Sequence, residues 1–140
     1  MDINFIFVYG KLREFYTNEE IFDVESLISY PVTTSGLLYD YHGDAILIED
    51  KDSRVFGNLL VATDIDKLLR KTDQFMEFDE EDYEHSRYIR GIKKIDTDIL
   101  GGGVSAWCYL YPTSHKILLD RDAKLITSGN WLEYKKGIKK

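Results

Sequence analysis

The segment Tyr9-Gly10-Lys11-Leu12 has the residue types and the position of an anion-binding turn. It ends an apolar run of β-forming residues, Ile3–Tyr9, which is typical of a strand buried on both faces. Backbone N–H groups after Gly10 would lack sheet partners, and glycine lets a backbone approach a ligand closely. The segment is therefore either a concave site for an anion or an ordinary strand-to-loop turn.

Two further groups of residues could bind a metal ion or take part in catalysis. The acidic run Glu77–Glu84 could bind Ca²⁺ or Mg²⁺, but it lacks the ligand spacing and central glycine of an EF-hand loop. We predict a solvated loop there and no metal site. His42, His85 and His115 lie far apart in the sequence, in different predicted loops, so we expect surface histidines rather than a ligand set or a catalytic triad.

Cys108 is the sole cysteine, which excludes an internal disulfide and the cysteine-rich type of zinc site. It falls in a predicted strand, Val104–Tyr111. Alternation places four small or apolar residues on one face of this strand: Val104, Ala106, Cys108 and Leu110. We therefore predict a buried, inert thiol. Three aromatic residues, Trp107, Tyr109 and Tyr111, share the other face and either line a ligand cavity or pack under a helix.

These candidates depend on a predicted order of strand, helix, three strands, helix and two strands. The predicted strands are Ile3–Tyr9, Thr34–Tyr41, Ala45–Glu49, Arg54–Ala62, Tyr88–Ile95 and Val104–Tyr111. Glu19–Ser29 is a predicted short helix, and a second begins near Asp64, where apolar residues adopt helical spacing. Lys11–Tyr16 is expected to be a polar exit from the first strand. Gly57, inside a predicted strand, indicates a bulge or a close backbone approach.

Length and composition agree with one small domain. We expect a single domain over residues 1–134, followed by a basic C-terminal tail at 135–140. Short strands with two helices predict a mixed α/β (α+β) fold, with a curled sheet or a small β-barrel rather than a doubly wound sheet.

Charge and hydropathy limit the partners and the location of the protein. The net charge of −7 argues against binding to nucleic acid or to an anionic membrane as the main function. The sequence has neither the pattern of a signal peptide nor a run of about 18 apolar residues, so we expect a cytoplasmic protein.

Seven segments, in order along nearly the whole chain, resemble the gamma-glutamylcyclotransferase-like (AIG2-like) family. They are FVYGKLR (Phe7–Arg13), GLLYD (Gly36–Asp40), VFGNLL (Val55–Leu60), TDQFMEFD (Thr72–Asp79), SRYIR (Ser86–Arg90), AWCYLY (Ala106–Tyr111) and SGNW (Ser128–Trp131). None of these motifs is specific alone, but seven in the correct order are hard to obtain by chance. The resemblance implies a small fold built around a β-barrel with a cavity.

The resemblance also implies a reaction, in which a γ-glutamyl amine or amide cyclises to 5-oxoproline and releases its amine. The substrate's own α-amine attacks its δ-carbonyl, the backbone at Tyr9, Gly10, Lys11 and Leu12 cradles the glutamyl group, and a Glu moves the proton. No metal or cofactor is needed, because well-oriented intramolecular reactions reach effective molarities of about 10⁵–10⁸ M. A catalytic Glu starts from a pKa of about 4.3 and needs burial to raise it.

The sequence departs from the family pattern at the base. The family's catalytic Glu aligns with Met76, and Glu77 falls on the next position. If the helix runs through residue 77, Met76 points inward and Glu77 points to solvent. If the helix ends near Phe75, Glu77 can turn inward and is the candidate catalytic residue. Lys11 also replaces a family Ser or Thr, and Gly43-Asp44 replaces the usual Tyr-Pro.

These departures leave the following functional hypotheses. The first is a gamma-glutamylcyclotransferase-like enzyme whose activity is weak or lost because of Met76. The alternative is a non-catalytic relative that keeps the cavity and binds a small γ-glutamyl or similar carboxylate ligand. A third hypothesis is a pure interaction protein.

Overall fold

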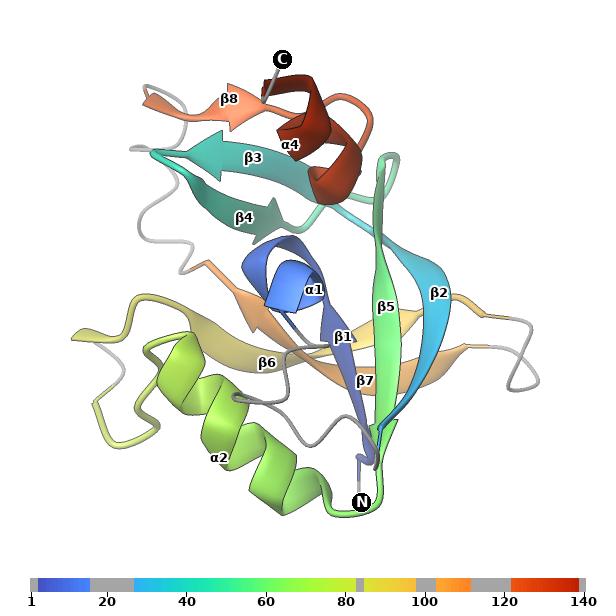
Figure 1. Cartoon of the computed structure of the whole chain (residues 1–140), viewed down its shortest axis with the longest axis vertical. Helices are drawn as coiled ribbons and strands as arrows, with labels where there is room; N and C mark the ends of the chain where they lie inside the picture. Colours follow the sequence, from blue (N-terminus) through green and yellow to red (C-terminus); the bar gives the residue numbers. More distant parts are fainter. Residues whose placement is uncertain (1–2, 16–26, 83–84, 98–102, 112–121, 139–140) are drawn as a thin grey trace.

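The computed structural model describes residues 3–15, 27–82, 85–97, 103–111 and 122–138, and these form a mixed α+β structure (Figure 1). One sheet has the strand order β2-β5-β1-β7-β6 and the other β4-β3-β8. The strands are β1 (Phe5–Val8), β2 (Leu27–Ser35), β3 (Leu37–Tyr41), β4 (Asp44–Ile48), β5 (Arg54–Ala62), β6 (Ile89–Ile95), β7 (Val104–Leu110) and β8 (Lys124–Leu125). The described helices are α1 (Gly10–Phe15), α2 (Ile65–Phe75) and α4 (Trp131–Ile138).

The predicted fold class is confirmed, but the described strands form two sheets rather than one small barrel. The predicted strand Thr34–Tyr41 is interrupted at Gly36, where the chain passes from β2 in the first sheet to β3 in the second. The five-stranded sheet is nevertheless curled. Its edge strands approach each other at an isolated bridge between Thr33 of β2 and Asp96, the residue after β6. Thr34 Oγ1 donates a hydrogen bond to the Lys94 carbonyl at 3.0 Å beside this bridge.

The first strand is buried on both faces, as its sequence predicts. It pairs antiparallel with β5 and parallel with β7. Ile6 and Val8 belong to one hydrophobic cluster, which includes the apolar side of α2. Phe7 points into a second cluster with residues of the three-stranded sheet and α4. Figure 1 shows the same division, with α2 across one end of the molecule and α4 beside β3 and β8 at the other.

Helix α2 forms where the helical spacing predicts it. Its N-cap is Asp64, whose Oδ1 accepts a hydrogen bond from the Lys67 backbone N–H at 3.1 Å. Leu68, Leu69 and Thr72 are its buried residues. No described helix is long and apolar enough to cross a membrane.

Three predicted segments differ from the structure. The exit at Lys11–Tyr16 is wrong for residues 11–15, which lie in α1 and bury Leu12. Most of the predicted helix Glu19–Ser29 lies outside the described residues, but 27–29 belong to β2, because this strand pairs with β5 from Leu27 onward. Residues 135–138, expected in a tail, are helical.

The helical conformation of residues 135–138 follows from the anchoring of α4. Trp131, at its first position, is fully buried, and the Tyr134 hydroxyl donates to Asp40 Oδ2 at 2.5 Å. This hydrogen bond with Asp40 raises the pKa of Tyr134 to about 12. The tyrosine therefore keeps its proton, and the bond, over the physiological pH range.

We predict that Gly57→Ala destabilises the protein. A Cβ at this position would lie 2.4 Å from the Val8 carbonyl oxygen and 2.5 Å from the Phe7 ring, which confirms the close approach expected from the sequence. Overpacking of this kind lowers the free energy of unfolding by about 1–3 kcal/mol, measurable by urea denaturation. Gly91→Ala in β6 is the matched control, because its nearest contact would be Leu110 Cδ1 at an ordinary 3.4 Å. We expect a change within about 0.5 kcal/mol there, and equal losses in both variants would contradict the prediction.

Candidate functional site

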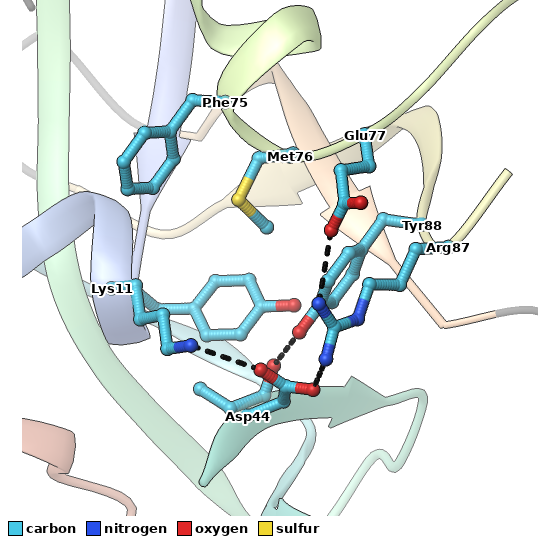
Figure 2. Close-up of a pocket in the computed structure, with 9 residues that line it drawn as sticks. Lys11, Asp44, Phe75, Met76, Glu77, Arg87 and Tyr88 are labelled. Carbon is cyan, nitrogen blue, oxygen red and sulfur yellow. Dashed lines mark hydrogen bonds and ion pairs between the residues drawn. The ribbon is translucent and has the colours of Figure 1, made fainter.

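A pocket of about 120 Å³ lies beside the end of β1 (Figure 2). Four parts of the chain build it: the β1–α1 junction, the start of β4, the end of α2 and the segment before β6. Its lining residues are Tyr9, Lys11, Asp44, Ala45, Phe75, Met76, Glu77, Arg87 and Tyr88.

The structure divides the predicted cradle into two lining residues and two packing residues. Tyr9 and Lys11 line the pocket. Gly10 has a left-handed backbone (φ 63°), and a Cβ there would lie 2.3 Å from the Ala45 Cβ, so glycine allows β4 to approach the start of α1. Leu12 is 2% exposed and packs in the core. The role of this segment as a substrate cradle stays a prediction.

The two pocket tyrosines are neutral. Tyr9 donates a hydrogen bond to the Tyr109 carbonyl at 2.5 Å, and Tyr88 donates to the Ala45 carbonyl at 2.9 Å. Burial raises the pKa of Tyr9 and of Tyr88 well above the ordinary value of a tyrosine. Both rings therefore contribute apolar walls and satisfied hydroxyls, and the charge of the pocket comes from other residues.

Four charged side chains form a connected network across the pocket (Figure 2). The Asp44 carboxylate accepts from Lys11 Nζ at 3.1 Å and from Arg87 Nη2. Arg87 Nη1 also donates to Glu77 Oε2 at 2.9 Å. Asp44 is buried, with 9% of its side chain exposed, whereas the other three are 47–64% exposed. The network joins two acids and two bases, so its formal charge is zero.

Asp44 reaches the pocket because a tight hairpin presents it. His42 and Gly43 both have positive φ, at 53° and 91°, and they connect the paired residues Tyr41 and Asp44 of β3 and β4. A two-residue loop with positive φ at both positions matches the twist of antiparallel strands. The predicted turn is confirmed, but sequence reasoning did not place Asp44 in the site. The available signal was the departure from Tyr-Pro at Gly43-Asp44.

Arg87 was also missed, and its place depends on the acidic loop. The Arg87 backbone N–H donates to the Glu77 carbonyl at 3.2 Å. Buried Ser86 holds the loop closed, because its Oγ accepts from the Asp79 N–H at 2.9 Å and lies 2.9 Å from the Asp82 carbonyl oxygen. The described acids of this run are exposed, as predicted for a loop, and residues 83–84 lie outside the described part.

The end of α2 decides how Met76 and Glu77 lie. The last helical residue is Phe75, and Met76 is the C-cap. Met76 is 8% exposed and lines the pocket, as predicted. Glu77 takes a left-handed backbone (φ 55°), and its side chain reaches the pocket rim with 64% exposure. Figure 2 shows the Met76 thioether pointing into the pocket and the Glu77 carboxylate turned toward Arg87.

This arrangement limits the proton chemistry of the pocket. A thioether is only a weak hydrogen-bond acceptor and does not take a proton from an ammonium. The carboxylates that line the pocket are Asp44 and Glu77. Within the described residues no group of three or more His, Cys, Asp or Glu could hold a metal ion. His42 and His85 are exposed, as expected, and His115 lies outside the described residues.

On the aromatic face of β7, Tyr109 packs under α2. The Tyr109 hydroxyl donates to Asp73 Oδ1 at 2.5 Å and lies 2.6 Å from Thr72 Oγ1. Burial and the hydrogen bond to Asp73 raise the pKa of Tyr109. Arg90 stacks on Trp107, with Cζ 4.7 Å from the ring centroid, and pairs with Asp73. Of the two alternatives for these aromatics, packing under the helix is correct for Tyr109.

The sequence at residues 6–133 matches the family described as gamma-glutamyl cyclotransferase, AIG2-like. The chain belongs to this family. No curated protein matches the chain.

Several solved structures share the fold of this AIG2-like chain. YkqA from Bacillus subtilis is 21% identical with a TM-score of 0.66, over 97% of this chain and 42% of that one. The chain therefore spans less than half the length of YkqA. An AIG2-like protein from Mus musculus is 21% identical with a TM-score of 0.57, over 81% and 80% of the two chains. An uncharacterized protein, PH0828 from Pyrococcus horikoshii, is 13% identical with a TM-score of 0.61, over 97% and 95%.

We predict that Cys108 does not react in the folded protein. Its side chain is fully buried, and burial raises the pKa of the thiol. Labelling by an aromatic disulfide reagent must wait for the structure to open, so we expect it to be about 10³-fold slower or more than in denaturant. Ser128→Cys is the control, because it adds a thiol at an exposed turn that should react at once. Rapid labelling of two thiols in the folded control variant would contradict the prediction.

Proposed function

We propose that the protein binds a γ-glutamyl amine or amide in this pocket and cyclises it slowly to 5-oxoproline, with release of the amine. The observation that carries the proposal is the pocket at the end of β1, where Tyr9 and Lys11 of the family's YGxL segment face Met76 and Glu77 from the end of α2. Membership of the cyclotransferase family supports the reaction class.

The size of the pocket suits the glutamyl part of such a substrate. Its volume of about 120 Å³ is well below that of a typical pocket for a drug-sized ligand, about 300–1,000 Å³. An amino-acid head group fits this scale, and a long amine would have to extend outside. Apolar walls from Phe75, Met76 and Tyr88 can hold the glutamyl chain folded, which brings its α-amine to its δ-carbonyl.

Proton transfer is the step of the proposed reaction that this pocket supports least. The α-ammonium must lose a proton before it attacks, and the leaving amine must gain one. The family's Glu aligns with Met76, which cannot perform either transfer. A general acid–base group is typically worth about 10²–10⁴-fold in rate. We therefore expect binding to persist while turnover falls by about this factor.

The positions of Met76 and Glu77 also favour a second candidate function, that of a non-catalytic relative that only binds the ligand. Glu77, the predicted catalytic residue, is mostly exposed, because Arg87 holds its carboxylate at the rim. In this position it does not act as a base inside the pocket. Catalysis by Glu77 would require this ion pair to open and the side chain to turn inward.

Position 76 gives the decisive test. We expect wild type to form 5-oxoproline slowly from a panel of γ-glutamyl amines, and Met76→Glu to raise turnover by about 10²–10⁴-fold, because it returns a carboxylate to the position of the family's Glu. Met76→Gln is the matched control, since it has the same shape without a basic group, and should stay at the wild-type rate. Glu77→Gln should also leave the rate near that of wild type.

Other outcomes select other functions. Fast wild-type turnover that Glu77→Gln abolishes would make Glu77 the catalytic base and overturn the account based on Met76. Absence of 5-oxoproline with both wild type and Met76→Glu, while calorimetry still detects binding, would identify the non-catalytic relative.

A further inference from the structure

We infer that Asp44 makes the pocket specific for a zwitterionic α-amino-acid head group, by binding its ammonium while Lys11 and Arg87 bind its carboxylate. The inference rests on the proposed function, because it concerns the same pocket. It adds the residue that decides which ligands are accepted.

Asp44 is the carboxylate that the fold places inside the pocket. Its side chain is 9% exposed, against 64% for Glu77. It stands at the first position of β4, directly after the two-residue hairpin loop, so its backbone is fixed by pairing with Tyr41. A ligand group that enters the pocket therefore meets a carboxylate whose position is set before binding.

Lys11 and Arg87 already bind a carboxylate, namely that of Asp44. Each approaches from its own element, and each keeps about half of its side chain exposed, at 47% and 49%. Long, half-exposed cations can turn toward an incoming anion without disturbing the backbone. A ligand carboxylate can thus take the place of Asp44 at these two cations.

Exchange of partners leaves Asp44 in need of a new cation. A buried carboxylate without a partner is costly, and the ligand's ammonium supplies one. The four-residue network has zero formal charge, and a zwitterionic head group also has none, so the complex stays neutral with every charge paired. A carboxylate ligand without an ammonium would instead bring a third carboxylate to the two cations, beside Asp44 and Glu77, and give the site a formal charge of −1.

The expected discrimination is large enough to measure. A hydrogen bond to a charged group contributes about 1.5–3 kcal/mol, which corresponds to roughly 10- to 150-fold in affinity. We therefore expect the wild type to bind a ligand with a free ammonium at least about 10-fold more tightly than the same ligand without it.

The test compares L-γ-glutamyl methylamide with its deamino counterpart, glutaric acid monomethylamide, by calorimetry on the full chain. Wild type should prefer the first ligand by at least about 10-fold. In Asp44→Asn the preference should fall within about threefold, and the deamino ligand should bind no more weakly than to wild type, because Lys11 and Arg87 are released. Glu49→Gln is the matched control, since it removes an exposed carboxylate paired with Lys93 outside the pocket, and should keep the full preference.

Several results would overturn the inference. These are equal affinities in wild type, binding of neither ligand by folded wild type, an unchanged preference in Asp44→Asn, or a preference that disappears in Glu77→Gln instead. The wild-type comparison decides the matter even if Asp44→Asn does not fold. A clear preference without 5-oxoproline formation would reject the cyclisation and support this inference, whereas 5-oxoproline formation with equal affinities would reject this inference alone.

Discussion

The structure depends on the burial of one short strand. Strand β1 has only four residues, yet β5 and β7 pair with its two edges and separate hydrophobic clusters cover its two faces. A strand enclosed in this way has a fixed position and register. Because it ends just before Gly10, the packing of the whole domain determines where Tyr9 and Lys11 meet the pocket.

The pocket itself joins segments that are distant in the chain. Asp44 lies 33 residues from Lys11 and 43 residues from Arg87. Each arrives by a local structure of its own: a short helix for Lys11, a hairpin for Asp44 and a loop closed by Ser86 for Arg87. The fold thus brings a buried carboxylate and two half-exposed cations together, although no single segment of the sequence contains the site.

The sequence predicted the features that periodicity or local chemistry determines. The doubly buried first strand, the start of α2 at Asp64 and the inward face of Cys108 all follow from spacing over a few residues. The six residues of α1 are too few for a helical period to be visible. The separation into two sheets and the Asp44–Arg87 contact depend on long-range pairing, which a single sequence does not reveal.

The end of α2 shows how one residue can change the outcome. Helical geometry correctly predicted that Met76 faces inward, but the predicted position of Glu77 depended on the residue at which the helix ends. A left-handed backbone at Glu77 places its side chain between the two predicted alternatives, lining the pocket yet mostly exposed. Such helix ends are the least certain part of any prediction from sequence.

The anchoring of α2 has an evolutionary consequence. The helix is held near its end by Thr72 and Asp73, which contact the Tyr109 hydroxyl, while Arg90 pairs with Asp73. None of these four residues lines the pocket. The residue at position 76 can therefore change without loss of the contacts that hold the helix in place. Over the course of descent, the side chain that this helix presents to the pocket can be exchanged through one codon, while the same shape is inherited throughout.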